Sequence, residues 1–69
     1  MYHKHLRQAG HSRRFEIREL DGVWEVRAAH DSRIVKHARY DDWHRVERTM
    51  LAFSLEVLAL EAEGWTAAD

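Results

Sequence analysis

The stretch that decides the fold reads FEIRELDGVWEVRA and spans residues 15–28. Apolar and polar residues alternate on both sides of Asp21-Gly22, and Asp-Gly is a strong signal for a two-residue type I′ hairpin turn, in which both turn positions need positive φ. A loop of two residues pairs Leu20 with Val23 and fixes every pair behind them. The alternation and the turn therefore predict an antiparallel hairpin.

This register sorts the side chains of the hairpin onto two faces, because cross-strand partners share a face. The apolar face collects Phe15, Ile17, Trp24, Val26 and Ala28. The opposite face sets Arg18 across from Glu25 and Glu16 across from Arg27, which are two pairs of opposite charge. Turn chemistry and pairing thus agree on one register.

A third strand is predicted over residues 33–40, after a turn at residues 30–32. Two facings are open for it. The first turns inward Ile34, Ala38 and Tyr40. The second turns inward Val35, His37 and Arg39. We prefer the first, in which Lys36 extends along a sheet edge, because it buries fewer charges.

A long helix is predicted after this strand, running on to Glu63. Asp41-Asp42 supply an N-cap and negative charge at the positive helix end, and Gly64 follows as a stop. Apolar residues recur at spacings of three and four and predict the seam that covers the sheet. This seam comprises Trp43, Val46, Met50, Phe53, Val57, Leu60 and Gly64.

The predicted fold class is α+β, a three-stranded antiparallel sheet followed by one long C-terminal α-helix packed on one sheet face. It occupies residues 14–69 as a single β-β-β-α domain, since 69 residues leave no room for a second domain. Residues 1–13 hold basic and histidine residues with few apolar positions, so we expect a mobile basic tail there. A chain of this size is marginally stable without a metal, a staple or a partner.

The helix carries a second apolar stripe on its opposite side, formed by Leu51, Leu55, Leu58 and Ala62. Burying three leucines stabilises a protein by about 1.5–3 kcal/mol each, so we expect another surface to pack over this stripe. The preferred cover is a second copy of the chain, which makes this stripe a homodimer interface. Two alternatives remain open: the tail or the Trp65-Thr66 segment folds over the stripe, or a helix of another protein docks there.

Charge is distributed unevenly and suggests a second function. Residues 1–40 carry nine Lys and Arg against five Asp and Glu, a net charge of +4, whereas residues 41–69 carry two against seven, a net charge of −5. A basic sheet face together with the tail could contact nucleic acid, although few exposed aromatic residues are expected for base stacking. The candidate contacts are Arg13, Arg14, Arg18, Arg27, Arg33, His37 and Arg39.

Catalysis and cofactor binding find little support in the sequence, so we expect a non-enzymatic protein without a cofactor. No serine lies in a nucleophile-elbow motif, and no cysteine is present to act as a nucleophile or to bind zinc. Two groups of residues could in principle bind a metal ion. One is the amine of Met1 with His3, and the other is His44 with Glu47 and Asp41. Capping of the helix explains the second group better, and we predict no metal site. The absence of cysteine favours the cytoplasm, and no signal peptide, membrane span or membrane-surface helix is expected.

Overall fold

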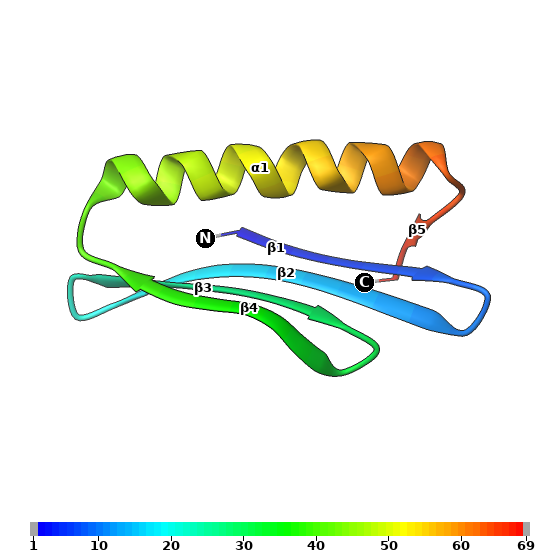
Figure 1. Cartoon of the computed structure of the whole chain (residues 1–69), viewed down its shortest axis with the longest axis horizontal. Coiled ribbons are helices and arrows are strands. Elements are labelled where there is room, and N and C mark those ends of the chain that lie inside the picture. The colour runs from blue at the N-terminus through cyan, green and yellow to red at the C-terminus, as the bar shows by residue number, and fades with distance from the viewer. Residues whose placement is uncertain (1, 69) are drawn as a thin grey trace.

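The computed structural model describes residues 2–68, which form one antiparallel sheet with a single long helix lying along one face (Figure 1). The sheet order is β4-β3-β2-β1-β5. The elements are β1 (Tyr2–Gln8), β2 (His11–Leu20), β3 (Val23–His30), β4 (Arg33–Tyr40), α1 (Trp43–Ala62) and β5 (Thr66–Ala67). The α+β class and the C-terminal helix packed on an antiparallel sheet are confirmed, but the sheet has five strands and not three.

The expected mobile tail is wrong for residues 2–13: residues 2–8 form strand β1, and residues 11–13 already belong to β2, which pairs with it. The residues of β1 on the helix side include Tyr2, which packs against the core, and Leu6, which is fully buried. Lys4 lies between them on the same side and breaks the apolar alternation, so the sequence pattern resembles a polar tail. Ala9-Gly10, with φ values of 50° and 84°, closes the turn to β2.

The hairpin of β2 and β3 has the predicted register throughout, from Leu20 paired with Val23 to Phe15 paired with Ala28. Its Asp21-Gly22 turn has positive φ at both positions, as a type I′ turn requires. The Asp31-Ser32 turn between β3 and β4 also has positive φ at both positions, without a glycine.

Strand β4 follows the preferred facing over only part of its length. Ala38 and Tyr40 pair with residues of the helix-facing side of β3, and Lys36 pairs with Ala28 on that side. The register then shifts at Ala28/Ala29, so that Ile34 pairs with Ala29 and lies 52% exposed. The β-bulge reverses the facing of Ile34, and alternation alone cannot predict such a bulge.

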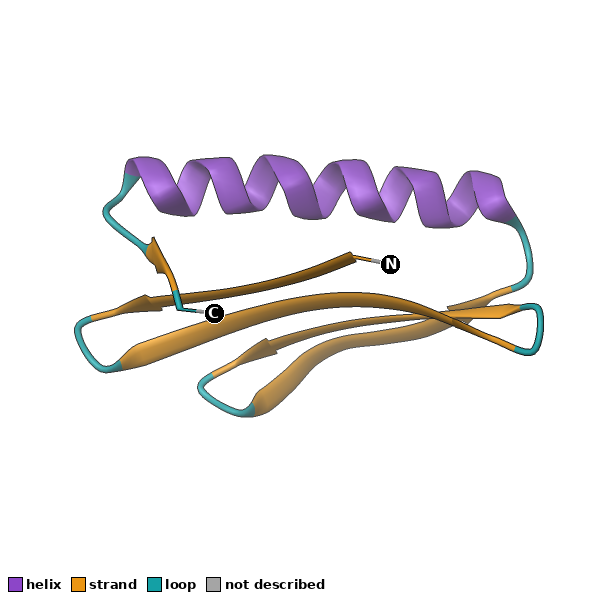
Figure 2. Ribbon diagram, turned by 180° about the vertical axis from the view of Figure 1, so that it is seen from behind, coloured by secondary structure: helices purple, strands orange, loops and turns teal. Residues whose placement is uncertain are grey.

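The core lies between α1 and the sheet. The view from behind shows the helix running along one face of the sheet (Figure 2). The helix begins after its N-cap, Asp42, whose side chain accepts a hydrogen bond from the His44 backbone N–H at 3.0 Å. Most of the predicted seam is confirmed, with Thr49 buried as an unpredicted addition. The buried helix residues are Val46, Thr49, Phe53, Val57 and Leu60.

The N-terminal part of the seam is less buried than predicted. Met50 is half-buried, and Trp43 remains 43% exposed while its ring packs on Trp24 with centroids 4.9 Å apart. After the helix the chain turns at Gly64 and returns to the sheet as β5, which pairs with β1. The Gln8 side chain donates to the Glu63 carbonyl at 2.7 Å and ties the helix end to the same strand.

Candidate functional site

The outer leucine stripe, defined as Leu51, Leu55, Leu58 and Ala62, lies on the side of α1 that faces away from the sheet. All four residues are exposed, and the three leucines have exposed fractions of 62%, 58% and 62%. Leu58 borders a hollow that Tyr2 and Lys4 of β1 also line, but the described parts of the chain ends leave most of each leucine exposed. Tyr2–Gln8 is paired in the sheet, and Trp65 packs against the core. The alternative in which the chain covers its own stripe is therefore wrong for residues 2–68.

Charged residues along α1 distinguish its two halves. The N-terminal half carries Arg45 and Arg48 beside Glu47, whereas the C-terminal half carries Glu56 and Glu61 with no Lys or Arg. An antiparallel helix pair places unlike halves side by side. The outer leucine stripe thus has a charge pattern that favours antiparallel over parallel association with a second copy.

A second surface is the open sheet face, the side of the sheet without a helix. Alternation along the paired strands places on it five arginines and two glutamates. The arginines are Arg7, Arg14, Arg18, Arg27 and Arg39, and the glutamates are Glu16 and Glu25. The difference is a local charge of +3, and His3, His5 and His37 lie on the same face.

Glu25 organises the middle of the open sheet face. Its carboxylate lies 3.1 Å from His37 Nε2, 3.3 Å from Arg18 Nη2 and 3.6 Å from Arg39 Nε, and Arg27 Nη2 is at 3.7 Å. The hydrogen bond with His37 and then that from Arg18 lower the pKa of Glu25 from 4.5 to about 2, with a further contribution from the charge of Arg27. One carboxylate therefore lies beside three arginine side chains and one imidazole while neutralising only one charge.

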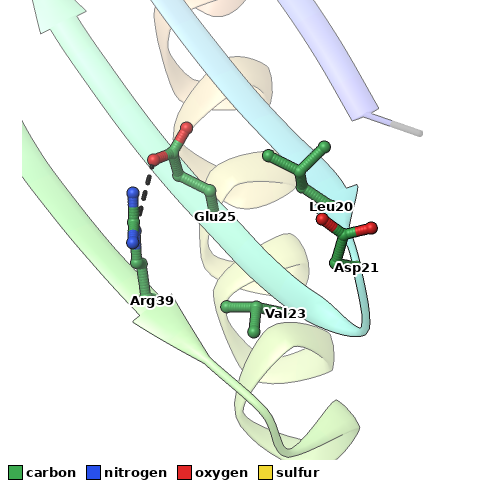
Figure 3. Close-up of a pocket in the computed structure, with 5 residues that line it drawn as sticks. All are labelled: Leu20, Asp21, Val23, Glu25 and Arg39. Atoms are coloured by element: carbon green, nitrogen blue, oxygen red, sulfur yellow. Dashed lines mark ion pairs between the residues drawn. The ribbon is translucent and has the colours of Figure 1, made fainter.

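Beside this cluster lies a shallow hollow of about 220 Å³. Figure 3 shows the side chains of Leu20 and Val23, with Asp21 beside Leu20, on one side of the hollow and the Glu25–Arg39 ion pair on the other. An apolar and a charged region thus adjoin on the open sheet face.

The structure brings together five of the seven residues predicted to contact nucleic acid. Arg14, Arg18, Arg27, His37 and Arg39 lie on the open sheet face. Arg13 lies on the helix side instead, where its guanidinium pairs with Glu56 and stands 5.5 Å from the Phe15 ring centre. Arg33 pairs with His30 beyond the bulge and shares the helix side with Arg13.

Sequence reasoning assigned Arg7 to a basic tail that could contact nucleic acid, and it did not place Arg7, His3 or His5 on the open sheet face, because it expected no strand in residues 1–13. It also missed a cluster of His11, His30 and Asp31, the one group of three potential metal ligands among residues 2–68. The signal was present, since the hairpin register continued outward places residue 12 opposite residue 31. Asp41, His44 and Glu47 do not form such a group within the described chain, and the amine that would accompany His3 belongs to Met1, outside the described residues.

Comparison of the chain with protein-family models, curated proteins and solved structures found no match. Among residues 2–68, no helix combines the length and the apolar character that crossing a membrane requires.

Proposed function

We propose that the chain is a small non-enzymatic interaction module that forms a homodimer through the outer leucine stripe, with the two helices antiparallel. The observation that carries the proposal is the exposure of Leu51, Leu55 and Leu58 on one helix face. Twofold symmetry lets one apolar patch cover its own copy, so no second complementary surface is needed.

The charge pattern supports the antiparallel arrangement. With the twofold axis near Leu55, Arg48 lies across from Ala62 of the second copy and beside its acidic neighbours, Glu61 and Glu63. The resulting dimer has four layers, sheet, helix, helix and sheet, so that the two open sheet faces point outward. As its location we propose the cytoplasm, a proposal that rests on the cysteine-free composition.

Charge substitution within the stripe tests the dimer. Leu55→Glu is expected to convert dimer to monomer in sedimentation velocity, because each dimer would then bury two unpaired carboxylates. The matched control is Leu20→Glu, which places the same charge at a 72% exposed leucine of the open sheet face. A wild-type chain that sediments as a monomer up to the highest soluble concentration contradicts the proposal, as does equal dissociation by both variants.

The second candidate function is nucleic-acid binding by the open sheet face, favoured by the three arginines and His37 around Glu25. Arginine guanidinium groups bind phosphate through paired hydrogen bonds. The tyrosines, tryptophans and phenylalanines of the sheet lie on its helix side, so we expect phosphate contacts without base stacking. Affinity should therefore depend steeply on salt and weakly on base sequence.

Fluorescence anisotropy with labelled duplex and single-stranded DNA tests this candidate. Arg18→Gln with Arg39→Gln should weaken binding and reduce the slope of log affinity against log salt by about one for each phosphate that the variant no longer neutralises. Arg33→Gln is the matched control, because Arg33 lies on the other face. No anisotropy change at low salt, or an equal effect of Arg33→Gln, would exclude the open sheet face as the binding surface.

A further inference from the structure

The end of the sheet below the C-terminus of α1 carries a cluster of two imidazoles and one carboxylate. His11 begins β2, His30 ends β3, and Asp31 opens the following turn. One nitrogen from each histidine and one oxygen of Asp31 lie within 4.8 Å of one another. His11 precedes Asp31 by 20 residues in the chain, and the pairing of β2 with β3 holds the two together.

We propose that His11, His30 and Asp31 form a binding site for a divalent transition-metal ion of the zinc class. The Asp31 Oδ2 atom lies 2.8 Å from His11 Nδ1 and 3.5 Å from His30 Nε2. Ligand atoms around a tetrahedral zinc ion lie roughly 3.4 Å from one another, because each is about 2.0–2.2 Å from the metal. An ion can therefore enter between the three atoms with small side-chain adjustments.

The carboxylate is held in place by the backbone. Its second oxygen, Oδ1, accepts a hydrogen bond from the Ser12 N–H at 2.8 Å, and the Asp31 N–H donates to the Ser12 carbonyl at 2.9 Å. Oδ2 is thus oriented toward the two imidazoles, and a hydrogen bond to a ligating carboxylate is the kind of support that orients metal ligands in proteins.

The ligand set selects the class of ion. Two imidazoles with one carboxylate suit zinc, cobalt and nickel better than magnesium or calcium, which prefer oxygen ligands. All three residues are exposed, so water would occupy the remaining coordination positions and the ion would be open to exchange. A bound ion would link β2, β3 and the turn after β3. Because the ion binds only the folded chain, it would stabilise the fold.

Calorimetric titration of the full chain with Zn²⁺ tests the site. We expect one ion per chain and at least about tenfold weaker binding for His11→Ala, His30→Ala and Asp31→Asn. Asp31→Asn is the sharpest variant, because an amide keeps the acceptor for Ser12 but loses the anionic ligand. The matched controls are His37→Ala and His44→Ala, which remove exposed histidines elsewhere and should leave the affinity unchanged.

Tryptophan fluorescence gives an independent measure, since the Trp65 ring lies 6.4 Å from that of His30. Ni²⁺ should quench this emission in the wild type and in Trp43→Phe, and quench it much less in Asp31→Asn. Circular dichroism verifies that each variant is folded. Zn²⁺ binding that persists without His11, His30 and Asp31, or that is lost in His3→Ala, would overturn the proposal and place the ion at the N-terminal strand.

Discussion

Leu6→Ala and Leu58→Ala make the same chemical change at two places that the structure treats differently. Leu6 of β1 is fully buried in the core under the helix, whereas Leu58 is 62% exposed on the outer leucine stripe. Removing a buried leucine side chain costs about 2–5 kcal/mol, a large fraction of the stability of a domain this small. Removing Leu58 from a separate chain should cost less than about 1 kcal/mol, because most of the side chain is already in water.

Thermal unfolding followed by circular dichroism measures both effects. In dilute solution, Leu6→Ala should lower Tm by roughly 10 °C or more, at about 4–8 °C per kcal/mol, and Leu58→Ala by a few degrees. At about a hundredfold higher concentration the wild type should gain Tm through dimerisation, and Leu58→Ala should gain less. An unchanged Tm for Leu6→Ala would refute the place of β1 in the core, and an equally large loss for Leu58→Ala in dilute solution would refute an uncovered stripe.

Three further substitutions test local features. Asp42→Ala removes the cap on the His44 N–H and should lower the free energy of unfolding by about 0.5–2 kcal/mol in urea titrations. An unchanged free energy of unfolding would contradict a stabilising role of this cap. Ser32→Gly relieves a φ of 67° and should raise Tm slightly, whereas a lower Tm would show that the hydroxyl matters more than the strain. In the wild type, the lowered pKa of Glu25 stabilises the folded chain above pH 4.5, and this stability is lost as the pH falls to about 2 and the carboxylate is protonated. Glu25→Gln removes this contribution, so the Tm of the variant should fall less over the same pH range. Glu61→Gln is the matched control, and an acid transition unchanged by Glu25→Gln would contradict the cation cluster.

The parts of the fold that the sequence predicts are those in which two local signals agree. Asp21-Gly22 with alternation on both sides predicts the register of β2 and β3 pair by pair, and Asp42 with Gly64 bounds the helix to within a residue or two. Strand β1 escapes prediction because its helix side is apolar only at Tyr2 and Leu6. A strand near the edge of a sheet tolerates polar residues when its partner strand and the helix supply the burial.

The candidate surfaces follow the same division. The exposure of Leu51, Leu55 and Leu58 follows from helical periodicity alone. The open sheet face depends on long-range pairing: the bulge beside Ala29 moves Arg33 to the helix side, and no local signal specifies it. Side-chain choices such as that of Arg13, which pairs with Glu56, depend on tertiary contacts that alternation does not describe.

Isotope-filtered nuclear Overhauser spectroscopy on a mixture of labelled and unlabelled chains tests most directly how two copies meet. We expect contacts between methyl groups of different chains at Leu51, Leu55 and Leu58, with the Leu55 methyl groups of the two copies closest to each other. Contacts between chains at Leu20, Val23 and Val35 with none along the helix would contradict the antiparallel helix pair, as would the absence of any contact between chains at high concentration.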